Sequence, residues 1–171
     1  MRTLDYATRL ATAAEASSIL AIEDAAGRKY AEAGLPGDLD GLDPSVVAAS
    51  ITAGTLWVVV DRDDRPVGFA LCQIRGDALH LRELDVHPDH MRQGLGRRLV
   101  ELVSERAATS GLARVTLTTF RDVAWNAPLY RRWGFATLEP DAQPGWLVAV
   151  RAEEDRGELR RWPRVAMARP I

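Results

Sequence analysis

The sequence contains a single cysteine, Cys72, and no long hydrophobic run. One thiol excludes an internal disulfide, and its place inside an apolar stretch is typical of a buried side chain in a reducing compartment. No stretch has the length that crosses a bilayer, and the N-terminus lacks the apolar core of a secretory signal. We therefore expect a cytoplasmic protein with no membrane partner.

The sequence also lacks an excess of charge of either sign. Its 22 lysines and arginines nearly balance 24 aspartates and glutamates, which gives a net charge of −2. Because a nucleic-acid-binding surface needs an excess of basic residues, we expect no nucleic-acid partner, and we expect no metal site either. An apolar fraction of 47% in 171 residues is typical of one globular domain, so residues 1–171 are predicted to form a single domain.

Residues 84–100 change from a strand pattern to a helix pattern. Leu84 and Val86 suit a strand, and from Leu95 onward the apolar residues recur at helical spacing. The turn between them, residues 91–96, reads Met-Arg-Gln-Gly-Leu-Gly. The first N–H groups of a helix have no internal acceptor and carry the positive end of its dipole, and glycine lets a ligand approach the backbone. The turn is therefore predicted to bind an anion, especially a phosphate or pyrophosphate.

Two other phosphate-binding patterns do not fit this turn. A dinucleotide-binding fold needs G-x-G-x-x-G after its first strand, whereas only G-x-G is present here and it lies in mid-chain. A nucleotide P-loop needs G-x-x-x-x-G-K-[ST], which this sequence does not contain. On this turn alone, a plain strand–turn–helix corner without a ligand stays open as the alternative.

The residues before the turn predict two helices and an antiparallel meander. Thr12 and Glu15 form a capping-box pattern, Gly34 is a suitable helix stop, and Asp43 precedes a proline at a helix start. Three apolar runs separated by tight turns then predict antiparallel strands. The expected elements are a strand at 2–11, helices at 12–33 and 44–53, and strands at 55–61, 67–75 and 78–86.

The residues after the turn predict three helices that alternate with strands. A strand–helix–strand unit makes residues 113–120 parallel to the strand at 78–86. Gly111 and Gly134 are suitable helix stops, and Asn126 is the expected N-cap of a short helix. The expected elements are helices at 93–110, 126–133 and 145–156, and strands at 113–120, 135–138 and 164–168.

Two motifs in this layout resemble those of the GCN5-related N-acetyltransferases, the GNAT superfamily. The turn is similar to motif A, [QR]-x-x-G-x-[GA], with Met91 in place of the first Gln or Arg. Residues 126–135, NAPLYRRWGF, are similar to a compressed motif B that ends in Y-x-x-x-G-F. The resemblance implies a single-domain α/β fold of α+β layout, with a central mixed, mostly antiparallel sheet flanked by helices.

The same resemblance implies an enzyme, an N-acetyltransferase that uses acetyl-CoA as co-substrate. It moves the acetyl group by direct transfer to a primary amine of a small molecule or a protein. In such proteins the turn holds the pyrophosphate, the N–H of Leu84 faces the acetyl carbonyl, Val86 pairs with pantetheine and Asn126 bonds the coenzyme arm. The implied coenzyme-binding residues are Leu84, Asp85, Val86, Met91, Arg92, Gln93, Gly94, Leu95, Gly96, Arg97 and Asn126.

Tyr130 and Glu83 are the catalytic residues that the resemblance implies. A thiol has a pKa of about 8.5 and a phenol one of about 10, so Tyr130 stays protonated near neutral pH and can protonate a leaving thiolate. Glu83 is the preferred general base, acting through a water, and His80 is the second choice. A structural ion pair is the alternative role for Glu83, and a half-buried aromatic with a wet hydroxyl is the alternative for Tyr130.

The acceptor and the assembly stay open. Tyr30, Asp38, Asp40 and Asp43 lie in or beside a loop that suits a cationic amine, although a solvated loop has the same composition. A non-catalytic acyl-CoA-binding or sensing module and a transferase of longer acyl-CoA donors are the alternative functions. Many proteins of this superfamily form homodimers, and the sequence shows no dimer-interface pattern that decides for or against a homodimer here.

Overall fold

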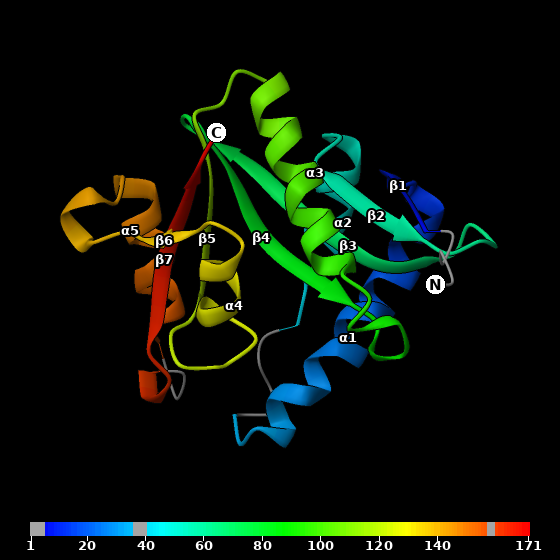
Figure 1. Cartoon of the computed structure of the whole chain (residues 1–171), viewed down its shortest axis with the longest axis horizontal. Coiled ribbons are helices and arrows are strands. Elements are labelled where there is room, and N and C mark those ends of the chain that lie inside the picture. The colour runs from blue at the N-terminus through cyan, green and yellow to red at the C-terminus, as the bar shows by residue number, and fades with distance from the viewer. Residues whose placement is uncertain (1–5, 36–40, 157–159) are drawn as a thin grey trace. The chain divides into compact units, whose positions relative to one another are not determined.

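The computed structural model describes residues 6–35, 41–156 and 160–171, and the chain divides into two compact units (Figure 1). The first unit comprises Met1–Gln73 and Leu81–Val103, and the second comprises Ile74–His80 and Ser104–Ile171. The strands form one seven-stranded sheet in the order β1-β2-β3-β4-β5-β7-β6. This mixed sheet with flanking helices confirms the predicted fold class, while the assignment of residues 1–171 to one domain stays a prediction.

The first unit begins with two helices whose caps were predictable. The Thr12 N–H donates to the Glu15 carboxylate at 2.8 Å, and the Asp43 carboxylate accepts the Ser45 N–H at 2.7 Å. These bonds satisfy N–H groups that a helix start leaves unpaired. The elements are β1 (Ala7–Leu10), η1 (Ala13–Glu15), α1 (Ala16–Glu32), α2 (Pro44–Thr52), β2 (Leu56–Val60), most of β3 (Pro66–Arg75) and of β4 (Ala78–Val86), η2 (Pro88–His90) and the start of α3 (Leu95–Thr109).

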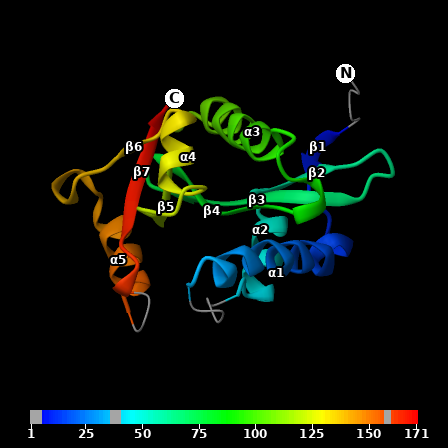
Figure 2. The same ribbon diagram turned by 60° about the horizontal axis from the view of Figure 1, so that its bottom comes forward.

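Helices cover both faces of the strands in this unit. Figure 2 shows α1 and α2 on one face of β2–β4 and α3 on the other. Residues 56–60 are therefore all buried, which explains their unbroken apolar run in place of the alternation of a half-exposed strand. Nine buried residues form the core beneath α1 and α2: Ala11, Ile19, Ile22, Val47, Leu56, Val58, Val60, Phe69 and Leu71.

The second unit is built around β5 (Arg114–Phe120), which has a different strand on each side. Ala78–His80 of β4 pair with it in parallel, as predicted, and β7 (Arg164–Pro170) pairs with it antiparallel along its whole length. The two-residue β6 (Ala136–Thr137) then pairs with β7. The remaining elements are α4 (Ala127–Arg132), η3 (Pro140–Ala142), α5 (Gly145–Glu154) and the end of α3.

The predicted N-cap position of α4 is confirmed, but the side-chain hydrogen bond expected of a cap is absent. Asn126 stands at the N-cap position, but its side chain makes no cap hydrogen bond, because its backbone (φ −114°, ψ −116°) is not in the extended conformation that aims a cap side chain at the helix. Its carbonyl instead accepts the N–H groups of Leu129 and Tyr130 at 2.9 and 3.0 Å.

The cysteine of the chain lies in the core, as its apolar neighbours in the sequence predicted. Cys72 lies on β3 and is fully buried, and burial raises the pKa of its thiol. Among the described residues, no helix combines the length and apolar character needed to cross a bilayer.

Gly68 on β3 lies where no side chain fits. A Cβ at this position would be 2.9 Å from the Asp85 carbonyl oxygen and 3.0 Å from Cγ1 of Val59.

Because the obstacle is a strand backbone, the Gly68→Ala variant is expected to lose about 1–3 kcal/mol of unfolding free energy in a urea titration. The matched control is Gly27→Ala within α1, where nothing lies within 4 Å, and it should gain up to about 1 kcal/mol. Wild-type stability of Gly68→Ala would contradict the observed packing.

Candidate functional site

The turn between β4 and α3 has a backbone arranged to bind an anion. Arg92 and Gly94 both adopt left-handed conformations, with φ of 60° and 77°. The first N–H of the helix with a backbone acceptor is that of Arg98, which donates to the Gly94 carbonyl at 3.0 Å. In the part of the chain that the structure describes, the backbone N–H groups of residues 92–97 have no backbone acceptor. A run of such donors with left-handed residues forms a concave nest for an oxyanion.

The side chains of the turn add positive charge around this nest. Arg92 and Arg97 are exposed, and Arg97 lies 3.8 Å from the Glu101 carboxylate, one turn further along α3. Met91 replaces the polar residue of motif A and is half-buried, so it offers no charged contact. The backbone donors and the two arginines fit a pyrophosphate group, and they do so without the missing side chain.

The end of β4 extends beyond its pairing with β5. The parallel pairing of β4 with β5 ends at His80, opposite Thr116. Leu84 and Val86 lie beyond that point and are half-buried. Groups on an unpaired strand edge can bond an extended ligand in the manner of an added strand. The predicted role of Leu84 and Val86 in binding pantetheine requires such an edge.

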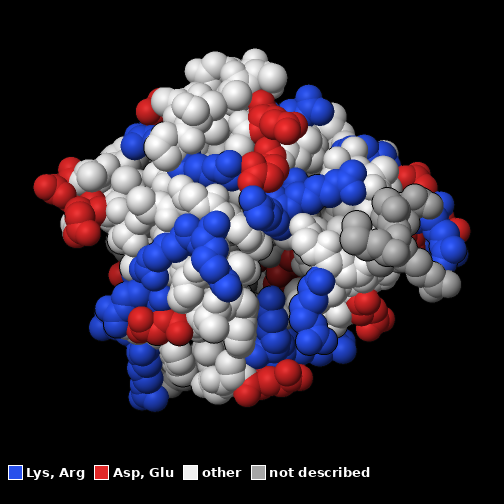
Figure 3. Space-filling model, viewed as in Figure 1, with Lys and Arg blue, Asp and Glu red and all other residues white. Residues whose placement is uncertain are grey.

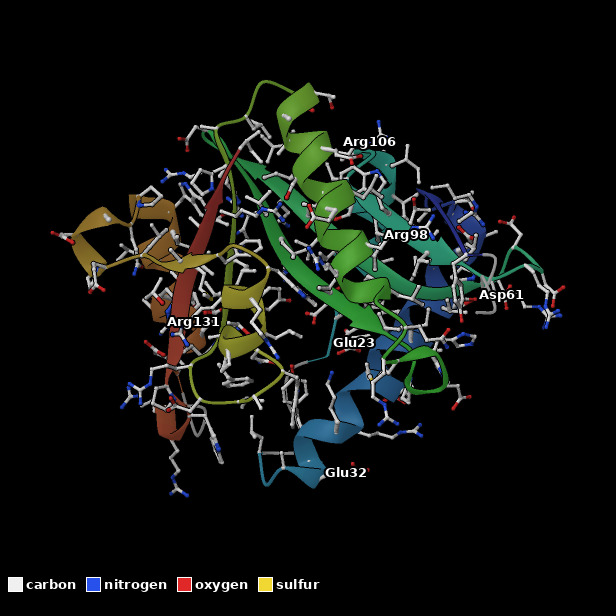
Figure 4. All side chains as sticks on the ribbon, in the orientation of Figure 1. Glu23, Glu32, Asp61, Arg98, Arg106 and Arg131 are labelled. Carbon is white, nitrogen blue, oxygen red and sulfur yellow. The ribbon has the colours of Figure 1, made fainter. Side chains whose placement is uncertain are left out.

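Four charged side chains gather beside the end of β4. Asp85 is only 8% exposed, and burial, followed by the neighbouring Glu83, raises its pKa well above the ordinary range of an aspartate. Glu23 of α1 adds to this rise, while Lys29 of α1 opposes it. Figure 4 shows Glu23 on α1 near the carboxyl end of β4. The cluster therefore holds Asp85 with a proton at pH values where an exposed aspartate has lost one.

Lys29 is the cation of this cluster. Burial lowers the pKa of its amine, and Asp85 and Glu83 partly restore it. Its Nζ also lies 5.6 Å from the centre of the Tyr30 ring. Glu23 and Lys29 were not predictable as site residues, because the periodicity of α1 gives no sign of which strand its polar residues face.

His80 has the contacts of a core residue. It is 4% exposed, its Nδ1 lies 3.0 Å from Oγ1 of Thr116, and its ring meets the edge of Trp146 at 5.2 Å between centroids. A histidine held in this way on β4 is shielded from solvent. These contacts favour Glu83 over His80 as the candidate base.

Tyr130 is fixed by the aromatic residues of its own motif. Its ring meets Trp133 and Phe135 edge-on, each at 5.6 Å between centroids. Gly134 (φ 90°) reverses the chain so that the Phe135 N–H donates to the Tyr130 carbonyl at 3.1 Å. Both the glycine and the aromatic residues of Y-x-x-x-G-F thus hold a half-buried tyrosine on α4, one turn after the buried Asn126.

The loop expected to receive an amine is only partly described. Asp38 and Asp40 lie outside the described residues. Asp43 serves as the cap of α2, and the hydrogen bond from Ser45 lowers its pKa. Its carboxylate thus has a structural role that the sequence also predicted.

Charge on the surface is mixed. On the face shown in Figure 3, lysine and arginine side chains lie among aspartate and glutamate side chains and form no single broad patch. Within the described residues there is also no group of three or more histidine, cysteine or carboxylate side chains placed to hold a metal ion.

Comparison with known proteins gives one family. The model of the acetyltransferase (GNAT) family matches residues 19–135, which is more than half of the chain. Over 84 residues the chain is 34% identical to the [ribosomal protein bS18]-alanine N-acetyltransferase of Salmonella typhimurium. That match covers 48% of this chain and 57% of the relative, so the aligned part spans little more than half the length of this curated relative.

Solved structures share the fold at low sequence identity. The ribosomal-protein-S18-alanine N-acetyltransferase of Escherichia coli has a TM-score of 0.69 at 19% identity, with 98% of this chain and 94% of that chain covered. The N-acetylglutamate synthase of Neisseria gonorrhoeae, complexed with coenzyme A and N-acetyl-glutamate, has a TM-score of 0.76 at 17% identity, with 99% and 36% covered. At such identities the likeness concerns the fold alone.

The buried carboxyl of Asp85 predicts a pH-dependent stability. Because its pKa is raised in the folded state, the folded chain binds more protons than the unfolded chain above the usual aspartate pKa of about 3.9. Stability is therefore lost as the pH rises from that value towards the raised pKa. The Asp85→Asn variant cannot ionise and should lose less stability than the wild type between pH 5 and pH 8, as measured by urea titration.

The control variant is Asp43→Asn, because Asp43 affects the pH dependence of stability in the direction opposite to Asp85. The pKa of Asp43 is lowered in the folded state, so its contribution is present at higher pH and is lost as the pH falls through the folded pKa. Asn is as good an N-cap as Asp, so Asp43→Asn should fold and should lose the Asp43 contribution at neutral pH. Identical pH profiles of Asp85→Asn and the wild type would show that Asp85 is ionised in the folded protein.

Proposed function

This chain belongs to the acetyltransferase (GNAT) family, and we propose that it transfers an acetyl group from acetyl-CoA to the amine of an acceptor. The observation that carries the proposal is the β4–α3 turn, whose N–H groups at residues 92–97 have no backbone acceptor within the described chain. A row of such donors at a helix start is suited to a pyrophosphate, which is the part of coenzyme A that all acyl donors of this kind share.

The proposed contacts of the coenzyme follow the chain. The backbone of Met91, Gly94, Leu95 and Gly96, with the side chains of Arg92, Gln93 and Arg97, holds the pyrophosphate. The backbone of Leu84, Asp85 and Val86 meets the pantetheine arm and the acetyl carbonyl, and the Asn126 amide bonds the arm. When bound, acetyl-CoA supplies an acetyl group on a thioester, which an amine can attack directly.

The proposed proton transfers use Glu83 and Tyr130. The acceptor amine must be neutral to attack, so Glu83 takes its proton through a water. Burial raises the pKa of the neighbouring Asp85 and so disfavours its ionised form, and we therefore assign the role of proton acceptor to Glu83. Tyr130 gives its proton to the departing sulfur, since a phenol is protonated at neutral pH. No serine or cysteine nucleophile is needed, in keeping with the buried Cys72.

The acceptor that we propose to test first is the N-terminal amine of a peptide. The Salmonella relative is named for an alanine of a ribosomal protein. An α-amine has a pKa of about 7.7–8.0, against about 10.4 for lysine, so a substantial fraction is neutral at physiological pH and a modest base suffices. A small-molecule amine is the other class. The cytoplasmic location and the homodimer stay predictions.

The binding of the coenzyme, on which the proposal depends, is tested by calorimetry with acetyl-CoA and with free coenzyme A. A ligand that binds only the folded state also raises the melting temperature, which gives an internal check. An amine panel, read by the appearance of free coenzyme A, would contain an alanine-initiated peptide, a polyamine and free lysine, with acetyl-, propionyl- and butyryl-CoA as donors. A folded sample that binds neither compound would refute the proposal, and binding without turnover of any amine would favour the non-catalytic module.

The Tyr130→Phe variant separates proton donation from packing. The phenyl ring keeps both edge contacts, to Trp133 and to Phe135, and loses only the hydroxyl. Loss of a general acid is expected to lower kcat by about 10²–10⁴-fold, with the calorimetric affinity for coenzyme A unchanged. Wild-type kcat in this variant would remove Tyr130 from the mechanism.

The Glu83→Gln variant tests the base. It keeps the size and the hydrogen bonding of the side chain but accepts no proton, so kcat/KM at neutral pH should fall by about 10²-fold. The loss should shrink as the pH rises, because more of the acceptor amine is then neutral. A loss of the same size at every pH would instead indicate that Glu83 has a structural role.

A further inference from the structure

Tyr6, which precedes β1, is hydrogen-bonded to the β4–α3 turn. Its hydroxyl oxygen lies 2.8 Å from Nδ1 of His90 and 3.3 Å from Oε1 of Gln93. The two rings of Tyr6 and His90 meet edge-on at 5.9 Å between centroids. All three residues belong to the first compact unit, although more than 80 residues of sequence separate Tyr6 from the turn.

The backbone of Tyr6 is held as well. Nη1 of Arg98 in the first turn of α3 donates to the Tyr6 carbonyl oxygen at 2.7 Å. Figure 4 shows Arg98 projecting from α3 towards the β1 side of the unit. Tyr6 is thus fixed at its carbonyl by the helix and at its hydroxyl by the turn.

The donors in this network follow from counting hydrogens. A tyrosine hydroxyl has one hydrogen and accepts through its oxygen. When it donates to Oε1 of Gln93, it must accept from the Nδ1–H of His90. Nε2 of a neutral His90 then carries no hydrogen, so the amide NH₂ of Gln93 is the donor that is left to face away from Tyr6. This amide can meet a ligand in the nest, because Gln93 lies between the two left-handed residues, Arg92 and Gly94.

We propose that Tyr6 is a positioning residue for the pyrophosphate of coenzyme A, and that it acts by aiming the Gln93 amide at the nest. This inference rests on the proposed function. Tyr6 does not touch the ligand itself. It converts the exposed Gln93 side chain of the turn into an oriented donor, and it thereby supplies a contact that motif A lacks where Met91 replaces Gln or Arg.

The Tyr6→Phe variant tests the proposal. It keeps the ring contact with His90 and removes the hydroxyl, so the affinity for free coenzyme A in calorimetry should fall by about 3–10-fold, the effect of one or two hydrogen bonds. KM for acetyl-CoA should rise with kcat preserved. With S-acetylpantetheine, a donor that lacks the pyrophosphate, the variant and the wild type should have equal KM. Equal losses with both donors, or no loss with coenzyme A, would overturn the proposal.

Two further variants complete the design. Gln93→Glu keeps an acceptor for the Tyr6 hydroxyl but replaces the amide donors with negative charge, so coenzyme A should bind it more weakly than it binds Tyr6→Phe. The control is Thr109→Val at the other end of α3, whose hydroxyl donates only to the Arg106 carbonyl at 3.1 Å. It should bind coenzyme A like the wild type.

A spectroscopic measurement reports the network without any ligand. Nitrogen NMR of the histidine rings should show His90 protonated at Nδ1 in the wild type and not fixed in that form in Tyr6→Phe. If the wild type itself fails to bind coenzyme A, the proposed function fails. If the wild type binds it and Tyr6→Phe binds it equally well, the proposed function stands and only this inference fails.

Discussion

The short parallel pairing between β4 and β5 is the constraint on which the proposed site depends. Only Ala78–His80 of β4 have partners on β5. Antiparallel neighbours continue on the outer sides of both strands, since the sheet order places β3 beside β4 and β7 beside β5. Had the pairing continued to Val86, the sheet would have used the backbone groups that a pantetheine arm needs. An incomplete ladder is a cost to stability that a ligand can offset.

The charged residues at the end of β4 are a second feature that costs stability. Removing the charged carboxylate of Asp85 from water is unfavourable, so burial raises its pKa. The nearby positive charge of Lys29 opposes part of this rise. The lysine in turn is held where burial disfavours its charge. A group of this kind adds little to stability, and clusters of perturbed ionisable groups are typical of sites that handle protons. The proximity of Glu83 to this cluster is the electrostatic argument for its proposed role.

Local sequence rules predicted most elements, and non-local packing explains what they missed. The cap at Asp43, the stops at Gly34 and Gly111 and the bounds of β4 depend on neighbours in the sequence, and the structure has them as predicted. The insertion of β7 between β5 and β6 depends on pairing across the chain, which periodicity does not encode. Glu23, Lys29 and Tyr6 were missed for the same reason, because each approaches β4 or its turn from a distant segment. The turn itself was recognisable because its glycines and its helix start are adjacent in sequence.

The burial of Cys72 has a consequence for a protein that would release a thiol with every turnover. Free coenzyme A forms mixed disulfides with accessible protein thiolates under oxidising conditions. Cys72 is the one cysteine of the chain, it is fully buried, and its thiol is kept from ionising. The folded protein therefore presents no partner for such exchange, so its own product cannot attach to it while it stays folded. Only unfolding would open this route, and thiolation of Cys72 would then serve as a chemical record of lost structure.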